Sequence, residues 1–122
     1  MRFEERELKP YAEPVLASDL KEGSVYFAVQ YLDEGMLTPE MEALIFIGKN
    51  LGQGDVGQLY FQDAVSYREG IRYGSPSGDR EALIYRQPEA EISHIFEYEH
   101  ALDALMGCAL RRREKGLDAK PR

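Results

Sequence analysis

This sequence has one cysteine, two histidines and no tryptophan, and each scarcity removes a class of protein. A single thiol, Cys108, excludes an internal disulfide framework and a cysteine-rich zinc site. With only His94 and His100, few side chains titrate near neutral pH. The chain also lacks the Gly-x-Ser-x-Gly elbow of hydrolases and the Gly-Lys-Ser/Thr step of phosphate-binding P-loops.

Long apolar runs and an excess of basic side chains are missing as well. No stretch approaches membrane-spanning length, and residues 1–7 are too charged for a signal peptide. Acidic side chains outnumber basic ones by 22 to 15, a formal charge of −7, whereas binding to a phosphate backbone requires a basic face. We therefore expect a cytoplasmic protein that binds neither membranes nor nucleic acid.

What is present indicates one folded domain over residues 1–122. The length suits a single core, and 43% apolar with 30% charged residues is near the globular norm. Charge, proline and hydrophobic periodicity divide the chain into four parts: an extended arm (1–23), a β region (24–86), a helical region (88–115) and a frayed tail (116–122). The arm is expected to pack through Tyr11, Val15 and Leu16.

The β region is organised around a strand from about Met41 to Gly48. Its centre, Leu44-Ile45-Phe46-Ile47, is a run of large apolar residues typical of a strand buried on both faces. The segment Asp63–Gly70 predicts one or two helical turns, and 74–80 predicts an exposed loop. Further strands are predicted at 24–32, 58–62, 71–73 and 81–86, the last two as a hairpin.

The C-terminal third predicts a helix over Glu97–Glu114. On a helical wheel, one apolar face collects Tyr98, Ala101, Leu102, Leu105, Met106 and Ala109. Residues 89–96 are compatible with helix, strand or loop. The predicted class is α+β: an antiparallel meander or small curled barrel of about five strands, followed by a long amphipathic C-terminal helix packed on the sheet.

The glycines of Gly52-Gln53-Gly54-Asp55-Val56-Gly57 match the dinucleotide spacing G-x-G-x-x-G. A dinucleotide site requires a helix after the last glycine, so that phosphate meets backbone N–H groups at its N-terminus. Here the next segment is a predicted strand, and Asp55 adds a negative charge. We interpret the stretch as a hairpin loop and expect no cofactor.

Three other motifs have plain structural interpretations. Glu97 and His100 have the i, i+3 spacing of helical di-metal sites, but such sites need a second copy, so no metal is expected. Cys108 is predicted to be a buried, inert thiol. The basic run 111–115 either stabilises the helix end or forms a docking patch for an acidic partner.

The aromatic-rich β region carries the only functional hint. Eight tyrosines cannot all be buried, because each hydroxyl needs a partner, and exposed tyrosines are frequent in interfaces and ligand grooves. His94 is the best candidate for a general base, beside an acid such as Glu97 or Asp63. The candidate interface or pocket residues are Tyr26, Tyr31, Tyr60, Tyr67, Tyr85 and His94.

Two functions remain open on this basis. The first is a small, non-catalytic module that binds a protein partner or a second copy of itself through the tyrosine-bearing sheet or the helix. The alternative is a small-molecule-binding protein or enzyme, with a tyrosine-lined pocket between sheet and helix that includes Tyr60, Tyr85 and His94. No catalytic residue is assigned by sequence alone.

Overall fold

The structure, a computed structural model, describes residues 7–9, 11–74 and 82–116. Most of the loop expected at 74–80, part of the arm and all but the first residue of the tail lie outside these ranges. Five strands are formed: β1 (Val25–Tyr31), β2 (Pro39–Lys49), β3 (Gln58–Asp63), β4 (Ile84–Pro88) and β5 (Ile95–Phe96). The helices are α1 (Ala64–Arg68) and α2 (Tyr98–Glu114), and short 3₁₀ turns form at η1 (Ala17–Asp19) and η2 (Glu89–Glu91).

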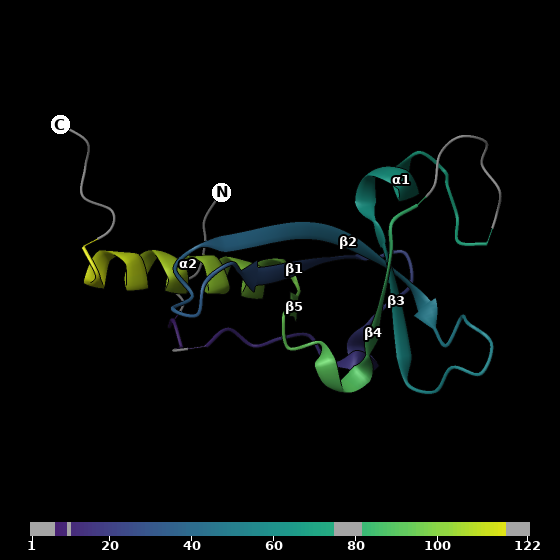
Figure 1. The fold of residues 1–122 in the computed structure, drawn as a ribbon, viewed down its shortest axis with the longest axis horizontal. Helices are drawn as coiled ribbons and strands as arrows, with labels where there is room; N and C mark the ends of the chain where they lie inside the picture. The colour runs from purple at the N-terminus through teal and green to yellow at the C-terminus, as the bar shows by residue number, and fades with distance from the viewer. Residues whose placement is uncertain (1–6, 10, 75–81, 117–122) are drawn as a thin grey trace.

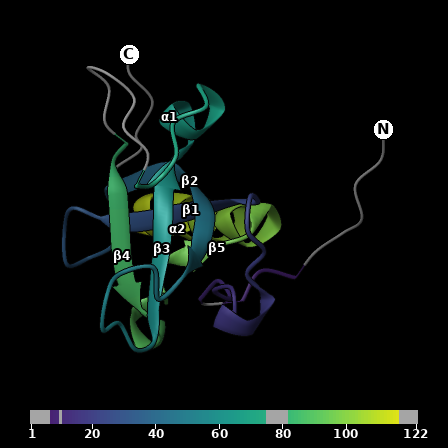
Figure 2. The same cartoon turned by 90° about the vertical axis from the view of Figure 1, so that its right-hand side faces the viewer.

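The strands make one antiparallel sheet in the order β4-β3-β2-β1-β5. Figure 2 shows β4 and β5 at opposite edges, and α2 behind the sheet. The sheet does not close, so the α+β prediction is confirmed with an open sheet rather than a barrel.

Strand β2 is the centre of this sheet, as its apolar run predicted. It pairs with β1 along Pro39 to Ile45 and with β3 from Leu44 to Lys49. The register with β3 shifts between Phe46 and Gly48, so Ile47 is an extra residue on the β2 side. Such a bulge increases the local twist, and in Figure 1 β3 and β4 run across the direction of β1 and β2.

One face of the sheet, which we call the inner face, carries the larger core. Alternating residues of the strands point into it, and Phe46 packs on Phe61 with 5.5 Å between ring centroids. The chain covers this face with Val15 from the arm and Ile92 from the segment after η2. The buried members are Val15, Tyr26, Leu44, Phe46, Leu59, Phe61, Ile92 and Ile95.

The opposite, outer face has two separate covers. Helix α2 packs on β1 and β5, where Val29 and Phe96 meet Ala101 and Ala104. Helix α1 contacts β2 and β3 instead, at the end of the sheet away from α2 (Figure 1). Adjacent residues therefore serve different cores, since Ile95 points to the inner face and Phe96 to the outer one.

The arm also protects a sheet edge. The N–H of Val15 donates to the carbonyl of Ile95 at 2.9 Å, which places the arm beside the two-residue edge strand β5. An edge strand with open N–H and C=O groups invites pairing with other chains, and a covering segment removes part of that risk. Of the three arm residues expected to pack, Val15 is buried, whereas Tyr11 and Leu16 are exposed.

The strand predicted at Ile71–Tyr73 is wrong, and so is its hairpin with 81–86. Ile71 is a buried coil residue whose carbonyl accepts a hydrogen bond from the Gln62 side chain at 2.7 Å. The edge of β3 is paired by β4 instead, from Gln58 with Pro88 to Gln62 with Ile84. A segment of three residues carries too little periodicity to distinguish these arrangements.

The prediction of the α2 boundaries is confirmed, but its predicted buried face is only partly right, since Ala101 is buried and Leu105 packs against the buried cluster of the outer face. The buried side chains of α2 are small: Ala101, Ala104 and Cys108. Leu102 and Met106, which the wheel placed on the packed face, are exposed. Short side chains let the helix backbone lie close to β1 and β5, and large ones at these positions would hold it away.

Candidate functional site

The six residues singled out from the sequence do not converge on one site. Tyr26 lies in the inner core, where its hydroxyl accepts a hydrogen bond from the Lys21 N–H at 2.8 Å. Tyr31 lies on the outer face, where its hydroxyl donates to the Ala104 carbonyl at 3.4 Å. Both hydroxyls thus connect the sheet to neighbouring backbone, on opposite faces.

Tyr60 and Tyr85 lie on adjacent strands and each pairs with a carboxylate. The Tyr60 hydroxyl donates to Asp55 of the glycine loop, and this bond raises the pKa of Tyr60 and lowers that of Asp55. The Tyr85 hydroxyl donates to Glu42 at 2.9 Å; burial, followed by this bond, raises the pKa of Tyr85. Tyr85 packs against the inner core, as does its strand partner Phe61. Since residues alternate along a strand, Tyr60 points to the outer face.

His94 precedes β5 and is partly buried. Burial lowers the pKa of its imidazole below the ordinary value of 6.5, and its backbone carbonyl accepts a hydrogen bond from Val29. Of the two acids proposed as its partners, Asp63 instead binds the first turn of α1, where it accepts from the Ser66 N–H at 2.9 Å. Glu97 is exposed at the N-cap of α2.

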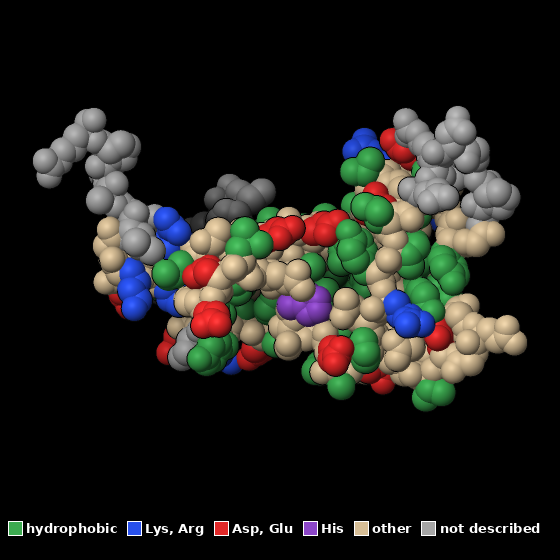
Figure 3. All heavy atoms as spheres, in the orientation of Figure 1, with side chains coloured by type: hydrophobic (Ala, Val, Ile, Leu, Met, Phe, Trp, Pro, Cys, Tyr) green, Lys and Arg blue, Asp and Glu red, His purple; other side chains and the backbone are tan. Residues whose placement is uncertain are grey.

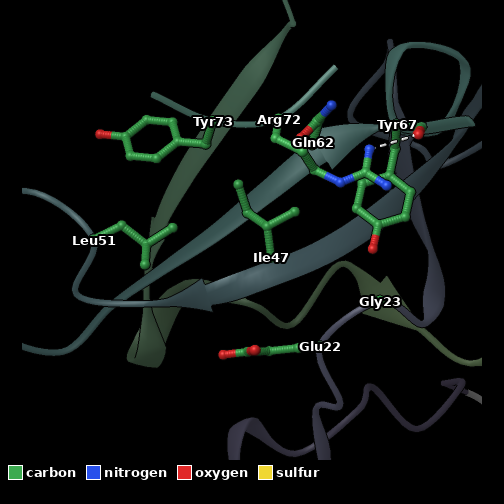
Figure 4. A pocket seen from close by; sticks show the side chains of 8 residues that line it. All are labelled: Glu22, Gly23, Ile47, Leu51, Gln62, Tyr67, Arg72 and Tyr73. Carbon is green, nitrogen blue, oxygen red and sulfur yellow. Dashed lines mark hydrogen bonds between the residues drawn. The ribbon is translucent and has the colours of Figure 1, made fainter. Parts of the chain in front are cut away.

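Tyr67 alone of the six lines the cavity of about 480 Å³ shown in Figure 4. This cavity lies on the outer face beneath α1, and its floor includes Ile47 and Gln62. The Gln62 amide donates to the Ser66 hydroxyl at 2.9 Å and to the Ile71 carbonyl at 2.7 Å. Its oxygen, Oε1, is buried and has no hydrogen-bond partner among the described residues.

Arg72 forms one side of the same cavity. Its Cζ lies 3.8 Å from the centroid of the Tyr67 ring, and Figure 4 shows the side chain extended toward that ring. The guanidinium also donates to the carbonyls of Tyr67 and Ile71, at 2.7 and 2.9 Å. Stacking on the Tyr67 ring and hydrogen bonds to two carbonyls fix the position of the Arg72 guanidinium. Arg72 is the only basic side chain in the described cavity lining.

A different surface, on α2, has the more distinctive composition. The helix meets the rest of the molecule on two sides. On the first, Ala101, Ala104 and Cys108 contact the sheet. On the second, the arm lies along the helix, since Tyr11 lines one cavity with His100 and another with Leu110.

The third side of α2, which borders the arm at Leu110, carries large apolar side chains that are partly exposed to solvent. Tyr98, Leu102, Met106 and Leu110 follow one another at intervals of four residues, and their exposed fractions are 61%, 66%, 53% and 40%. Residues four apart on a helix are neighbours, so these side chains form one continuous stripe. Tyr98 extends it toward the sheet, because its ring packs edge-on against Phe27 at 4.9 Å.

Charge is distributed unevenly along the same helix. Glu97 precedes its first residue, Glu99 and Asp103 lie in its first half, and 111–113 are three arginines in its last turn. Lys and Arg side chains gather at the left-hand end of the molecule in Figure 3, where α2 ends. Two of these arginines also contact the loop between β1 and β2: Arg111 donates to the Met36 carbonyl and Arg112 to that of Leu37.

The sequence contained a signal for this surface that our wheel did not use. Large side chains recur at 98, 102, 106 and 110, and small ones at 101, 104 and 108. A helix that is apolar on two opposite sides is expected to be covered on both. The predicted face combined Ala101 with Tyr98, Leu102 and Met106, and so did not separate the two stripes.

The remaining sequence motifs lie outside these two surfaces. The glycine stretch connects β2 to β3 as the predicted hairpin loop, held by Asp55, which accepts from the Gly52 N–H at 2.9 Å. His100 Nδ1 lies 3.4 Å from Asp103 Oδ2 on the helix surface. Across the described residues, no group of three or more His, Cys, Asp and Glu side chains could hold a metal ion. Within the same ranges, no helix combines the length and hydrophobicity needed to cross a bilayer.

In comparisons with known proteins, no family model, no curated protein and no solved structure matches this chain.

Proposed function

We propose that this protein is a small, non-catalytic interaction module that binds a protein partner through the stripe on α2. The observation that carries the proposal is the stripe itself: four large apolar side chains, consecutive at helical spacing and 40–66% exposed. Contiguous apolar patches of this kind are rare on monomers and mark protein interfaces. Aromatic and Met side chains, both present in the stripe, are enriched in such interfaces.

The partner's chemistry follows from the surface it covers. An apolar helix face or an apolar groove on the partner would fit a stripe with i, i+4 spacing. A basic group at one end of the partner surface would meet Glu99, and an acidic group at the other end would meet Arg113. The formal charge of −7 disfavours a nucleic-acid partner. As part of the same proposal we place the protein in the cytoplasm.

Site-specific photocrosslinking in the native cells tests the proposal. A benzophenone amino acid at Leu102 is expected to give discrete crosslinked protein bands. The matched control is the same label at Val65 on α1, which is equally exposed (69%) but lies away from α2. If position 102 gives no more product than position 65, the interaction proposal is wrong.

A second candidate function rests on the cavity beneath α1. Buried polar atoms are almost always hydrogen-bonded, so the unpartnered Gln62 Oε1 is an acceptor that a small molecule with an N–H or O–H donor would satisfy. The Gln62 orientation is set by the Ile71 carbonyl, which can only accept and so faces the amide nitrogen. The stacked Arg72 would hold an anionic group of the same ligand.

Fragment screening by ¹H–¹⁵N NMR tests this second candidate. Fragments that combine an amide N–H with a carboxylate are expected to shift the backbone resonances of Gln62, Tyr67 and Arg72. Gln62→Leu and Arg72→Met should each abolish the shifts. Shifts that survive both substitutions would count against the cavity as a binding site.

A further inference from the structure

Five residues on the exposed side of α2 are arranged symmetrically about Met106. Leu102 and Leu110 lie four residues to either side of it, and Glu99 and Arg113 lie seven residues to either side. At about 100° per residue, all four project within about 40° of the Met106 direction. We call these five residues the solvent face of α2; all of them are exposed.

This pattern is symmetric in shape and opposite in charge. Reversing the direction of the helix exchanges leucine with leucine and glutamate with arginine. A surface with this property is complementary to itself when turned by a two-fold rotation, which is the requirement for an isologous interface.

We propose that the partner bound by the solvent face of α2 is a second copy of this chain, with two α2 helices antiparallel and Met106 on the two-fold axis. The inference rests on the proposed function above and names its partner. In this arrangement Leu102 of each copy packs against Leu110 of the other, and Glu99 faces Arg113. The ion pairs form twice, once at each end of the interface.

The opposite orientation is disfavoured by the same residues. Parallel helices would place Glu99 against Glu99 and Arg113 against Arg113, and like charges at close range oppose association. Two copies that each carry a formal charge of −7 also repel one another in general. The basic end of α2 is where an acidic copy meets opposite charge, and antiparallel helices bring the acidic end to it.

The solvent face of α2 is held in place before any partner binds. Tyr31 anchors the helix through the Ala104 carbonyl at 3.4 Å. Near the other end, the Cys108 thiol and the Arg112 guanidinium both donate to the Leu37 carbonyl, at 3.4 and 2.8 Å. Binding by a preformed helix avoids the entropy cost of ordering it. Because Leu102, Met106 and Leu110 on the solvent face of α2 form a row of residues four apart, the two α2 axes should cross at about −50° and lie about 8–10 Å apart.

Sedimentation of the full-length chain tests the association. At about 100 µM we expect a species of twice the chain mass. Leu102→Glu should raise the dissociation constant at least about 100-fold, because it buries a charge at the centre of the contact. Val65→Glu is the matched control and should leave the dimer intact, while circular dichroism checks that both variants fold. A wild-type chain that stays monomeric overturns the inference.

Charge reversal tests the orientation. Glu99→Arg and Arg113→Glu should each weaken the dimer about tenfold, since each converts two attractive contacts into repulsive ones. The double variant Glu99→Arg/Arg113→Glu should restore association, because it exchanges the two charges. In a parallel dimer neither single change would alter the balance of like-charge contacts, so unchanged single variants contradict the antiparallel arrangement.

Cysteine crosslinking tests the register. Met106→Cys should give a disulfide-linked dimer under mild oxidation, because equivalent residues meet only on the axis. Leu102→Cys alone should not crosslink, whereas Leu102→Cys/Leu110→Cys should. Cys108 is buried and serves as the internal background. Efficient crosslinking by Leu102→Cys alone would contradict the register.

The photocrosslinking experiment distinguishes failure of this inference from failure of the proposed function. Products at position 102 that contain only other proteins would leave the interaction module standing and overturn self-association. Products that contain a second copy of the chain support both. No product would overturn both.

Discussion

Arg111 Nε donates a hydrogen bond to the backbone carbonyl of Met36 at 3.0 Å, and so joins α2 to the loop between β1 and β2. Met36 has a positive φ of 59°, which is uncommon for a residue with a side chain. The same guanidinium lies 5.3 Å from the centroid of the Tyr31 ring. One side chain therefore holds the helix, the first strand and a turn of unusual backbone conformation together.

Arg111→Ala is expected to lower the free energy of unfolding by about 1–3 kcal/mol. The substitution removes a charged donor and leaves the carbonyl of Met36 without its partner. Urea denaturation measures the change. Lys115→Ala, an exposed basic residue at the end of the same helix, is the control and should change stability by less than about 0.5 kcal/mol. Equal effects of the two substitutions would contradict the role given to Arg111.

Two glycine-to-alanine substitutions should act in opposite directions. A Cβ at Gly52 would lie 2.6 Å from the Tyr60 hydroxyl and 2.9 Å from Asp55 Oδ2, so Gly52→Ala should break their hydrogen bond and destabilise the hairpin loop. A Cβ at Gly107, inside α2, meets only the end of the Arg111 side chain, at 3.4 Å. Gly107→Ala should raise stability by about 0.5–1 kcal/mol, because alanine favours the helix. Thermal melting of both variants decides; a stabilised Gly52→Ala would be inconsistent with the loop geometry.

Asp63 should behave as the N-cap of α1. Burial raises the pKa of this carboxyl, but hydrogen bonds from Ser66 and Leu83 outweigh it and hold the pKa below the usual value. Asp63→Ala removes both contacts and is expected to cost about 1–2 kcal/mol in chemical denaturation. Asp63→Asn keeps one oxygen acceptor and should cost less. If both variants lose the same free energy of unfolding, the oxygen atoms of the Asp63 side chain do not stabilise α1.

His94 should make stability depend on pH below neutrality. Burial lowers its pKa in the folded chain, whereas in the unfolded chain imidazole titrates near the ordinary value of about 6.5. As the pH falls below about 6.5, the unfolded state takes up a proton that the folded state does not, so the free energy of unfolding falls until the folded pKa is reached.

His94→Gln tests this linkage. Denaturation curves measured between about pH 7 and pH 5 should show a smaller loss of stability for the variant than for the wild type. This window lies above the range in which carboxylates such as Asp63 are protonated, so the two contributions are separable. An identical pH slope in both proteins would show that His94 does not titrate differently in the folded chain.

Much of the local structure was predictable because its causes are local. The run Leu44–Ile47, bounded by Gly48, specified the central strand, and β2 forms there but begins two residues before the predicted Met41, at Pro39, which as the first residue of a strand is a position proline can occupy. Asp63 followed by a short segment ending at Gly70 predicted α1. The glycine stretch is a hairpin loop because a strand, Gln58–Asp63, follows it.

The candidate site was less predictable, because tyrosines of one β region were expected to meet and do not. Tyr26 and Tyr85 belong to the inner core, and Tyr31 and Tyr67 belong to opposite ends of the outer face. Which face a strand residue occupies follows from period two, but which elements cover that face depends on how the sheet twists. The bulge at Ile47 and the strong twist between β2 and β3 were not apparent from the sequence.

The sequence by itself determined most elements of this protein: β1, β2 and β3, the cap of α1, the glycine hairpin and the extent of the long helix, but neither β5 nor the coil at 71–73. Only the tertiary structure decided which side of α2 is buried. The small side chains of Ala101, Ala104 and Cys108 let the helix approach β1 and β5 closely, and this turned the larger Leu102 and Met106 outward. Periodicity shows that a helix has apolar sides, but the shape of the surface it meets selects the side that packs and the side left for a partner.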